Sequence, residues 1–548
     1  MENLREIYAQ WLKETAENEE IQAELKAIEG DEKEIEERFY KHLTFGTGGL
    51  RGILGAGTNR MNEYVIARIS LALADYLQNK YSSPSVAIAY DSRKKSDVFA
   101  HVAASVLISR GIKAYLFGEL MPTPILSFAV RHLGASAGIV VTASHNPKEY
   151  NGYKVYDHTG CQITTQAAEE IWGYAAQHSY LEFDPLVKEN YGKITYIGEE
   201  VVDRFLERVG SYCKLGDPAG LKIVYTPLNG TGNKPVRALL KKQGFENVTV
   251  VAEQELPDSD FTTCPYPNPE LKEALRLAIE YAEKEGADIV LATDPDCDRV
   301  GVAYQAGGGY RILTGNEVGI LLTNFLVETR QPKEPIIIST IVSSTLPEFI
   351  VKSSGGEAYY VYTGFKFIGE KMNELERSGD ISRHLLAMEE SCGYLIGDYA
   401  RDKDGVGASL LICEMASYYK SRGKTLGNVL ADIYKKYGYL LSKLYSFEFK
   451  GIEGERKIAG IMSALRKEGL QSLAGEKVSQ NTDYLEVTHL EKADVLSFST
   501  DKVKLIIRPS GTEAKIKFYL HVSGDTQENC EGKVRLFEER ELEKILKS

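Results

Sequence analysis

Residues 138–147 read Gly-Ile-Val-Val-Thr-Ala-Ser-His-Asn-Pro, an apolar run that stops on a hydroxyl, an imidazole, an amide and a proline. The apolar part predicts a short buried strand. Because proline lacks an N–H and disfavours helix in the residue before it, Asn146-Pro147 predicts a turn just beyond that strand. Ser144 and His145 would then lie at the strand's carboxyl end, where open α/β sheets bind ligands. A strand that ends in ordinary polar turn residues is the alternative.

Strand and helix patterns alternate around this stretch. Residues 85–90 predict a strand, a helix follows through about Ser109, and residues 114–117 predict a further strand. Alternation of this kind predicts a mostly parallel sheet with right-handed crossovers. The pattern loosens around residues 180–200, which predicts a domain boundary there.

Length, charge and cysteine usage limit the functional classes. The 548 residues predict about four domains. A net charge of −13 argues against binding nucleic acid or a membrane surface, since both need a basic face. The sequence has neither an apolar run of about 18 residues nor a signal-peptide core, so we expect no membrane span and no export. The seven cysteines contain no C-x-x-C pair, as is typical of a cytoplasmic protein.

The N-terminal part combines a helical pattern with a glycine-rich stretch. Residues 1–44 carry apolar side chains at helical spacing among many glutamates, which predicts an amphipathic extension that packs on the body. Residues 45–52 then read Phe-Gly-Thr-Gly-Gly-Leu-Arg-Gly. The glycines would let backbone N–H groups approach an anion, and Arg51 would add a charge. A flexible turn is the alternative.

Three aspartates follow a predicted strand at 287–293. Asp294, Asp296 and Asp298 alternate along a loop, so their side chains would point the same way and offer the oxygen ligands that Mg²⁺ prefers. Such crowded carboxylates repel one another without a cation, which favours a metal site over a surface turn. The loop is no EF-hand, because arginine and glutamine stand at its glycine and glutamate positions.

Polar residues also end a strand in a third predicted α/β unit, which begins near residue 315. A strand at 335–340 comes first, and residues 363–366 form a loop that ends on Lys366. A second strand at 385–388 leads to Glu389 and Ser391, whose carboxylate and hydroxyl suit the binding of sugar hydroxyls. A common surface triplet is the alternative.

The C-terminal region repeats the arrangement with a different chemistry. A predicted strand at 503–507 leads to Arg508, Ser510, Gly511 and Thr512, and a further strand at 515–522 and a closing helix at 530–546 follow. A guanidinium, hydroxyls and exposed N–H groups together form a good phosphate cradle. A plain polar turn is the alternative.

Taken in order, four of these loops resemble the signature loops of the α-D-phosphohexomutases, a superfamily that includes phosphoglucomutases and phosphomannomutases. The loops are residues 142–147, 294–299, 389–391 and 508–512. The resemblance covers nearly the whole chain. It implies an α/β fold with three related domains of mixed or parallel sheets and a C-terminal α+β domain around a central cleft. The implied bounds are 1–44 for the helical extension, 45–200, 201–314 and 315–440 for domains I to III, and 441–548 for the C-terminal domain.

The resemblance also implies a role for each loop. Ser144 would be the phosphoserine and would bind one Mg²⁺ together with Asp294, Asp296 and Asp298. Lys154 would be the general acid/base, with a pKa that nearby cations lower. His145, Arg51 and Arg299 would complete the catalytic group. Glu389, Ser391 and Lys366 would bind the sugar, and Arg508, Ser510, Gly511 and Thr512 would bind the phosphate that is not transferred.

The implied reaction interconverts glucose 1-phosphate and glucose 6-phosphate by two phosphoryl transfers. Glucose 1,6-bisphosphate would be its intermediate and activator, and the enzyme would be a monomer or a dimer. Residues 389–394 with 401–405 look like the subgroup that holds phosphoglucomutases and phosphopentomutases, so a phosphopentomutase or phosphomannomutase is an alternative. A metal-dependent phosphatase and a non-catalytic sugar-phosphate-binding paralogue are more distant alternatives.

Overall fold

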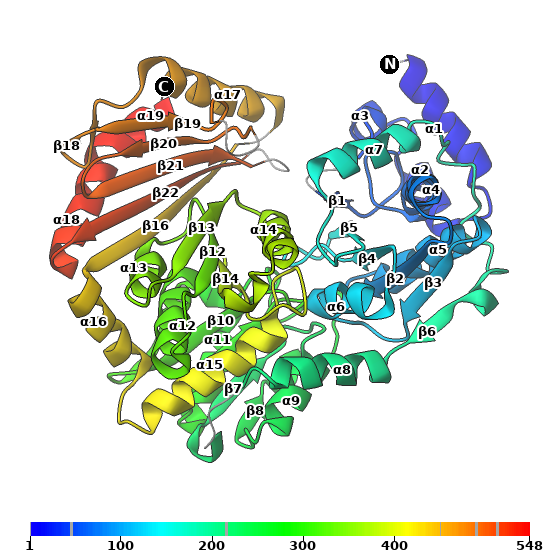
Figure 1. Ribbon diagram of the computed structural model, residues 1–548. Helices are drawn as coiled ribbons and strands as arrows, with labels where there is room; N and C mark the ends of the chain where they lie inside the picture. Colours follow the sequence, from blue (N-terminus) through cyan, green and yellow to red (C-terminus); the bar gives the residue numbers. More distant parts are fainter. Residues whose placement is uncertain are drawn as a thin grey trace. The chain divides into compact units, whose positions relative to one another are not determined.

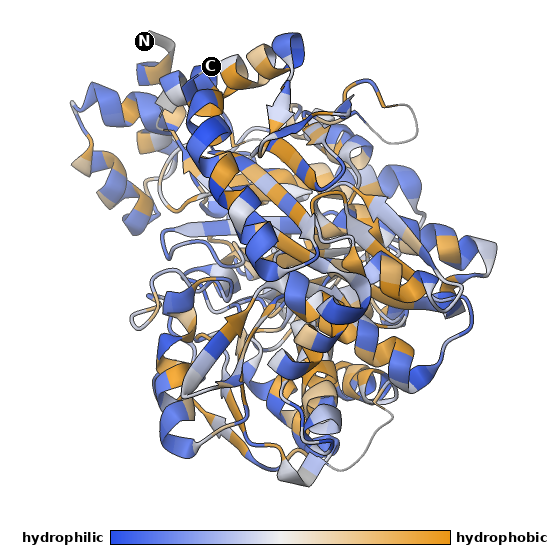
Figure 2. Cartoon of the chain, turned by 90° about the vertical axis from the view of Figure 1, so that its left-hand side faces the viewer, coloured by the Kyte–Doolittle hydropathy of each residue, from blue (hydrophilic) through white to orange (hydrophobic). Residues whose placement is uncertain are grey.

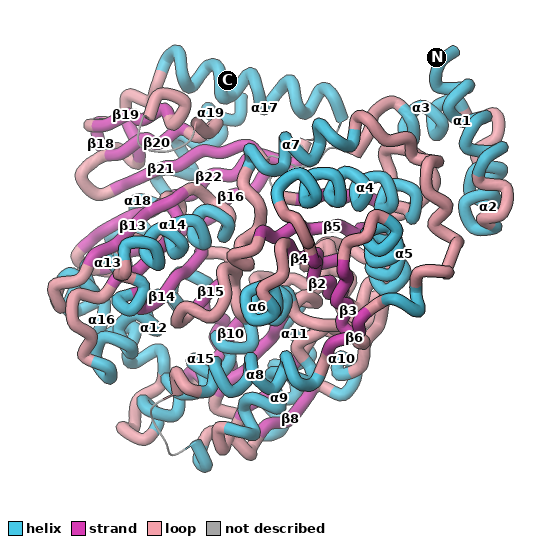
Figure 3. The backbone as a smooth tube through the Cα atoms, turned by 45° about the vertical axis from the view of Figure 1, so that its right-hand side comes forward, coloured by secondary structure: helices cyan, strands magenta, loops and turns pink. Residues whose placement is uncertain are grey.

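The computed structural model describes residues 2–43, 48–213, 218–449, 451–487, 492–510 and 515–547. The chain divides into two compact units. Unit 1 comprises Met1–Gly315 and Gly364–Thr425, and unit 2 comprises Asn316–Thr363 and Leu426–Ser548. Figure 1 follows the chain by colour, and Figure 3 separates its helices, strands and loops.

Three helices begin unit 1: α1 (Glu2–Glu14), α2 (Glu19–Ala27) and α3 (Glu32–Phe39). Asn18 caps α2 by accepting a hydrogen bond from the Ile21 N–H, 3.1 Å away, as is favourable at a helix N-terminus. Figure 2 shows hydrophilic and hydrophobic faces on these helices. Their apolar faces bury Trp11 against domain residues such as Tyr64. The predicted amphipathic extension is confirmed.

A six-stranded mixed sheet follows, in the order β1-β5-β4-β2-β3-β6. The strands β4, β2, β3 and β6 are parallel, whereas β5 and β1 run antiparallel to their neighbours. The predicted strands are confirmed, and the sheet is mixed because the chain turns back after Pro147 and forms the β4–β5 hairpin. The bounds are β1 (Gly49–Ile53), β2 (Ser85–Tyr90), β3 (Lys113–Phe117), β4 (Ala137–Val141), β5 (Tyr150–Asp157) and β6 (Thr195–Ile197).

Helices cover this sheet on both faces. The crossover from β2 to β3 and the crossover from β3 to β4 run in opposite directions across the sheet, so right-handed connections place α5 and α6 on opposite faces. Aliphatic side chains of α4, α5 and the central strands form one buried core. The helices are α4 (Glu63–Lys80), α5 (Ser96–Ser109), α6 (Thr123–Leu133) and α7 (Thr165–Ala175), with a 3₁₀ turn at Tyr191–Lys193.

A five-stranded sheet forms the second α/β domain, in the order β11-β10-β9-β7-β8. Its strands β8, β7 and β9 are parallel, and β9, β10 and β11 form antiparallel hairpins. The strands are β7 (Ile223–Thr226), β8 (Val248–Val250), β9 (Ile289–Thr293), β10 (Val300–Ala306) and β11 (Gly309–Leu313). The helices are α8 (Glu199–Gly210), α9 (Asn233–Lys242), α10 (Ala252–Glu255) and α11 (Lys272–Glu285), with a 3₁₀ turn at Pro218–Gly220.

The last segment of unit 1 contains two long helices around an antiparallel hairpin. The hairpin pairs Glu389 with Gly393 at its tip, so the strand of Glu389 ends beside a tight turn. The elements are α14 (Phe365–Ser378), a 3₁₀ turn at Ile381–Arg383, β14 (His384–Glu389), β15 (Gly393–Leu395) and α15 (Gly405–Lys420).

Unit 2 contains a parallel strand pair and an antiparallel C-terminal sheet. The pair is β12 (Ile336–Thr340) and β13 (Glu357–Val361), with α12 (Gly315–Arg330), α13 (Leu346–Lys352) and α16 (Leu426–Tyr437). The larger sheet has the order β16-β22-β21-β20-β19. Its strands are β16 (Tyr439–Glu448), β19 (Gln480–Asp483), β20 (Leu496–Ser499), β21 (Val503–Pro509) and β22 (Lys515–Gly524). A short hairpin, β17 (Ser472–Leu473) and β18 (Glu476–Lys477), lies apart from that sheet.

Helices α17 (Gly451–Glu468), α18 (Gln527–Phe537) and α19 (Glu543–Lys547) complete the C-terminal domain. The apolar side chains of α17 and α18 form one core with the strands β20, β21 and β22. The predicted strands at 503–507 and 515–522 are confirmed. The predicted closing helix is interrupted by a π-helical turn at Glu538–Leu542.

Candidate active site

Ser144 lies in a tight turn at the end of β4. Its backbone has φ 54°, a left-handed conformation that is uncommon for a residue with a side chain. The Ser144 N–H donates to Thr142 Oγ1 at 2.8 Å, and the Asn146 N–H donates to the Ala143 carbonyl at 3.1 Å. The side chain is almost entirely buried. The turn predicted at Asn146-Pro147 is therefore confirmed, and it holds Ser144 in a conformation that only surrounding contacts can maintain.

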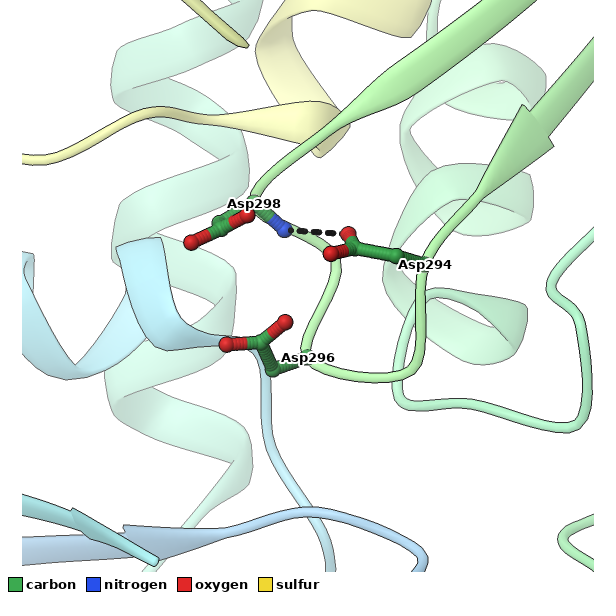
Figure 4. A group of neighbouring side chains, drawn as sticks. All are labelled: Asp294, Asp296 and Asp298. Atoms are coloured by element: carbon green, nitrogen blue, oxygen red, sulfur yellow. Dashed lines mark hydrogen bonds between the residues drawn. The ribbon is translucent and has the colours of Figure 1, made fainter. Parts of the chain in front are cut away.

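The three aspartates lie on the loop between β9 and β10, as Figure 4 shows. One oxygen from each of Asp294, Asp296 and Asp298 lies within 4.8 Å of the others, and all three side chains are buried. The backbone N–H groups of Asp298 and Arg299 donate to Asp294 Oδ1 at 3.1 and 2.9 Å. The carboxylates converge because the loop turns back on itself at Cys297, which has φ 51°.

This cluster fits a divalent cation. Asp296 Oδ1 and Asp298 Oδ1 are buried and have no hydrogen-bond partner among the described residues. Buried carboxylate oxygens without a donor are costly, and a hard cation satisfies them. The site includes the serine, because the Ser144 hydroxyl donates to Asp294 Oδ2 at 3.0 Å and lies 3.2 Å from His145 Nδ1. The structure therefore brings Ser144 and the three aspartates together.

The crowded carboxylates of Asp294 and Asp296 have pKa values that are shifted in opposite directions. Burial raises the pKa of Asp294, and the charges of Asp298 and Asp296 raise it further. For Asp296, burial also acts upward, but the Lys154 ammonium outweighs it and lowers the pKa. Without a cation, the pKa values of Asp294 and Asp296 therefore shift in opposite directions, as expected for like charges in a buried site.

Lys154 reaches the aspartates from the first domain. It lies on β5, where it pairs with Val140 of β4. Its Nζ is 2.8 Å from Asp296 Oδ2 and 3.7 Å from Asp298 Oδ2. The predicted lowering of its pKa is wrong: burial does lower it, but the carboxylates of Asp296 and Asp298 reverse the effect and raise the pKa. The predicted cations are less important here than the two anions that contact the ammonium.

Lys403 is a site residue that the sequence reasoning did not single out. Its Nζ lies 3.1 Å from Asp298 Oδ2 and 3.9 Å from Glu389 Oε2, so it links the loop of the three aspartates, the metal loop, to the end of β14. Burial lowers the pKa of Lys403, but the neighbouring carboxylates, Asp298 first, raise it overall. The charged run 401–404 just before α15 could have pointed to Lys403, but in the sequence it indicated only a resemblance to one subgroup of the family.

The remaining predicted catalytic residues lie around the same loops. Arg51 on β1 donates to Asn146 Oδ1 at 3.0 Å, beside Ser144. Arg299 forms an ion pair with Glu270, and its Nε lies 3.7 Å from Asp298 Oδ1. Burial and the two arginines lower the pKa of His145, which favours a neutral ring next to the serine.

The predicted sugar-binding residues are placed differently from one another. Glu389 is buried at the end of β14, where its Oε1 accepts the Gly364 N–H at 2.9 Å. Ser391 is half-buried on the turn that follows. Lys366 is buried at the start of α14, and its Nζ donates to Thr165 Oγ1 at 3.1 Å. Glu389 thus joins the metal loop through Lys403, whereas Lys366 contacts the start of α7.

The predicted phosphate-binding residues lie in unit 2. Arg508 is half-buried on β21, opposite Lys517 of β22. The Ser510 N–H donates to the Lys515 carbonyl at 2.7 Å, where the strand ends. Gly511 and Thr512 lie outside the described residues.

Among the described residues, every helix is too short or too polar to cross a membrane. The fold and the site together define a multidomain α/β protein in which a buried serine hydroxyl contacts a carboxylate site for a cation.

Comparison with known proteins identifies the family. Models of phosphoglucomutase/phosphomannomutase α/β/α domains I, II and III match residues 42–181, 202–308 and 314–437. A phosphoglucomutase of Staphylococcus aureus (strain N315) is 38% identical over 507 residues, which is 89% of this chain and 91% of that protein.

Two solved structures share the fold. A phosphoglucomutase/phosphomannomutase family protein from Burkholderia thailandensis has a TM-score of 0.69 and 21% identity, over 92% of this chain and 98% of that one. The open form of the Paramecium phosphoglucomutase pp63/parafusin has a TM-score of 0.68 and 16% identity, over 93% and 95%.

The chain therefore belongs to the phosphoglucomutase/phosphomannomutase family of the α-D-phosphohexomutase superfamily. It is an enzyme, a mutase that acts as an intramolecular phosphotransferase. The predicted fold class, three α/β domains followed by a C-terminal domain, is confirmed.

Proposed function

We propose that the chain is a Mg²⁺-dependent phosphoglucomutase that interconverts glucose 1-phosphate and glucose 6-phosphate. The observation that carries the proposal is the 3.0 Å hydrogen bond from the Ser144 hydroxyl to Asp294 in the aspartate cluster. This contact supports the proposal, because a phosphoryl acceptor would then lie against the ligands of a cation, as phosphoryl transfer requires. The 38% identical phosphoglucomutase from Staphylococcus aureus supports the choice of substrate.

Asp294, Asp296 and Asp298 would hold Mg²⁺, together with the phosphoryl group of Ser144. When bound, the ion would neutralise negative charge on the transferred group. Arg51 and Arg299 would add positive charge at the edge of the site, since Arg51 contacts Asn146 and Arg299 contacts Asp298. His145, with its lowered pKa, would stay neutral and accept or donate a hydrogen bond at the serine oxygen.

Ser144 would relay the phosphoryl group in two steps. In the first, a sugar hydroxyl attacks phosphorylated Ser144, the new O–P bond forms and the Ser144 Oγ–P bond breaks. This gives glucose 1,6-bisphosphate, which turns around in the site. In the second, Ser144 attacks the other phosphate, and the sugar oxygen leaves as a hydroxyl.

Lys154 would carry the proton of the sugar oxygen. Its ammonium, held by Asp296 and Asp298, is ready to donate in the step where the sugar oxygen leaves. By microscopic reversibility, the neutral amine accepts a proton from the sugar hydroxyl in the opposite step. Lys154 would lose its contacts with Asp296 and Asp298 when substrate binds, and this would permit the change from ammonium to neutral amine.

The other loops would bind the rest of the substrate. Glu389, Ser391 and Lys366 are proposed to contact the sugar, and Arg508, Ser510, Gly511 and Thr512 to bind the phosphate that stays. A clamp for the second phosphate retains the bisphosphate between the two steps, a function that a phosphatase does not need. We further propose the five-part division at residues 44, 200, 314 and 440, with one loop in each α/β or C-terminal domain.

The chain would act as a cytoplasmic monomer or dimer on a small sugar phosphate, without nucleic-acid or membrane partners. A phosphopentomutase or phosphomannomutase remains the second candidate, since the matching domain models cover both glucose and mannose enzymes. Values of kcat/KM for glucose, mannose, ribose and deoxyribose 1-phosphates separate these possibilities.

Substitution of the serine tests the proposed function directly. Ser144→Ala removes the phosphoryl acceptor, so we expect no mutase activity and no label on the protein from labelled glucose 1,6-bisphosphate. Ser136→Ala, a half-buried serine at the other end of β4, is the matched control and should keep both. Mutase activity that survives in Ser144→Ala would contradict the relay. Release of free phosphate without isomerised product would favour a phosphatase.

A further inference from the structure

Arg93 lies directly beneath the Ser144 turn. It follows β2, and its side chain is fully buried. One terminal nitrogen donates to the carbonyls of Ser144 and Asn146, both at 2.5 Å. The other donates to the carbonyls of Pro147 and Tyr150, at 2.9 and 3.2 Å. A single guanidinium therefore binds four carbonyls across the whole turn.

These four bonds explain how the turn keeps its shape. Three of the carbonyls, those of Ser144, Asn146 and Pro147, belong to the irregular segment between β4 and β5, and the fourth is that of Tyr150, the first residue of β5. A buried carbonyl without a donor is costly, and the left-handed backbone of Ser144 is strained. The planar fork of arginine supplies its donors in fixed directions, which the ammonium of lysine cannot do.

Asp91 fixes the orientation of this guanidinium. Its Oδ2 lies 3.2 Å from Arg93 Nε, and both side chains are fully buried. Its Oδ1 accepts hydrogen bonds from the Arg93 N–H at 3.0 Å and from Ser96 Oγ at 2.7 Å. The carboxylate thus compensates the buried charge and aims the fork at the turn.

The second domain contributes an aromatic ring to the same arginine. Phe261 lies in the loop after α10, and its ring centroid is 5.0 Å from Arg93 Cζ. The ring is fully buried. Its loop is held by Asp258, whose carboxylate accepts the N–H groups of Asp260 and Thr262 at 2.9 and 2.8 Å. A buried cation–π contact of this kind is favourable, because neither group is solvated.

The same loop of the second domain also contacts the metal-site arginine. Glu270, near its other end, forms the ion pair with Arg299. Lys148, just past the Ser144 turn, pairs with Asp260 at 3.1 Å, although both side chains are exposed and the pair adds little. Residues 258–270, which we call the domain II strap, therefore contact both the serine side and the metal side of the site.

From these contacts we infer that Arg93 is a positioning residue for Ser144, and that Phe261 makes this positioning depend on the second domain. The inference rests on the proposed function, because it assigns a role to the geometry of the serine that is phosphorylated. Arg93 touches no reacting atom. It acts through the turn that aims Ser144 Oγ at the aspartate cluster, so its loss should slow transfer more than it weakens substrate binding.

Two substitutions test the inference. Arg93→Lys keeps the positive charge but removes the fork, and Phe261→Leu keeps an apolar side chain but removes the ring. The matched controls are Arg68→Lys and Phe117→Leu. Arg68 is also buried, donates to the His178 carbonyl at 2.9 Å and stacks on the Tyr180 ring, away from the Ser144 turn. Phe117 is equally buried, on β3.

The readouts are the rate of Ser144 labelling by labelled glucose 1,6-bisphosphate, followed by rapid quench, and kcat and KM for glucose 1-phosphate well below the melting temperature. We expect Arg93→Lys to lower labelling and kcat about 100-fold, the cost of a displacement of about 1 Å, with KM changed less than about twofold. Phe261→Leu should lower both rates about tenfold. The controls should stay within about twofold of the unchanged enzyme.

Each outcome decides. Wild-type labelling rates in both variants, or equal losses in the controls, would overturn the positioning role while leaving the proposed function intact. An unlabelled wild-type enzyme would overturn the proposed function and this inference with it. Should Arg93→Lys fail to fold, Phe261→Leu decides alone, because it exchanges one apolar side chain for another.

Discussion

The Ser144 turn and the aspartate loop begin alike and are stabilised differently. Each follows a fully buried strand, and each contains one left-handed residue that is not glycine, Ser144 with φ 54° and Cys297 with φ 51°. The aspartate loop is bridged by its own side chain, since Asp294 accepts two N–H groups of the loop. The Ser144 turn has a bridge of this kind from Thr142, and it also receives donors from Arg93, which comes from a different strand end.

The two loops differ in the partner that each needs: the carboxylates of the aspartate loop need a cation, and the carbonyls of the Ser144 turn need a hydrogen-bond donor. A carboxylate satisfies N–H groups, so Asp294 bridges the aspartate loop, but the three carboxylates accumulate negative charge that a cation would balance. The Ser144 turn presents several carbonyls to the interior, and these accept hydrogen bonds from the positive guanidinium of Arg93. The aspartate loop is therefore suited to bind a cation from solution, whereas the Ser144 turn binds a side chain of the fold.

Loss of one aspartate should weaken cation binding by the aspartate loop, and we expect the largest effect on activity from this change. Asp296→Asn removes a buried charge whose Oδ1 has no partner among the described residues. We expect kcat/KM to fall about 1,000-fold, the upper range for loss of one electrostatic contact in an active site. Mg²⁺ should also raise the melting temperature of this variant less than that of the unchanged chain. Steady-state kinetics and thermal melts across a Mg²⁺ series measure both.

Asp203→Asn is the control for that prediction, because the Asp203 side chain is half-exposed and pairs only with Lys242 among the contacts described. It should behave as the unchanged enzyme does. An equal stabilisation of Asp296→Asn and wild type by Mg²⁺ would mean that the ion binds elsewhere.

Folding stability should fall in acid because of a residue in the hairpin that presents Glu389. His384 begins β14, and burial lowers its pKa to about 4, although its Nδ1 lies 2.8 Å from the Gly397 carbonyl. Because the folded-state pKa lies below the usual value near 6.5, the stabilisation is complete above that pH and is lost as the pH falls toward 4. The loss amounts to about 3 kcal/mol. Urea unfolding at pH 7 and pH 4 measures it.

The control is His384→Gln, which removes the titrating ring while keeping a hydrogen-bonding side chain. Its unfolding free energy should depend less on pH over this interval. An unchanged pH dependence would assign the acid sensitivity to other groups, such as the buried His521 of unit 2.

The aspartate loop could be predicted from the sequence because its chemistry is local. Three carboxylates at alternate positions after an apolar strand predict a turn whose side chains suit a cation, and the structure brings the three carboxylates together. The strands were predictable for the same reason, since their apolar runs bury both faces.

The supports of the Ser144 turn could not be predicted, because they come from distant segments. Arg93 lies 51 residues before Ser144, and Phe261 comes from another domain. Lys403 likewise reaches Asp298 from more than 100 residues away. The direction of the pKa shift of Lys154 was missed for the same reason: the sequence suggested cations nearby, whereas packing placed two aspartates against the ammonium.

Arg508, near the end of β21, should affect substrate binding more than turnover. Arg508 lies in unit 2, and we expect Arg508→Ala to raise KM for glucose 1-phosphate about 10- to 100-fold by loss of a charge-assisted contact to phosphate. The change in kcat should be smaller, because the residue is not assigned to the transferred group. Arg535→Ala, on the exposed face of α18, is the control. Unchanged KM in Arg508→Ala would remove that residue from the phosphate clamp.

The smallest predicted effect tests how independent the aspartate loop is. Gly405 begins α15, and its N–H donates to the Cys297 carbonyl at 3.0 Å. A Cβ at this position would lie 2.7 Å from that oxygen and 3.0 Å from the Arg299 carbonyl, so either the loop or the helix must move. We expect Gly405→Ala to weaken Mg²⁺ activation and kcat/KM about tenfold, since metal sites lose 10- to 100-fold when their supporting contacts change.

Gly173→Ala is the matched control, because nothing lies within 4 Å of its added methyl group and the residue is exposed on α7. It should leave activity unchanged and stabilise the fold by about 0.5–1 kcal/mol, since alanine favours the helix. Wild-type Mg²⁺ activation in Gly405→Ala would show that the aspartate loop holds its shape without α15. The contrast with the Ser144 turn would then be sharper, because the aspartate loop would keep its shape without the α15 contact, whereas the Ser144 turn would need the bonds from Arg93.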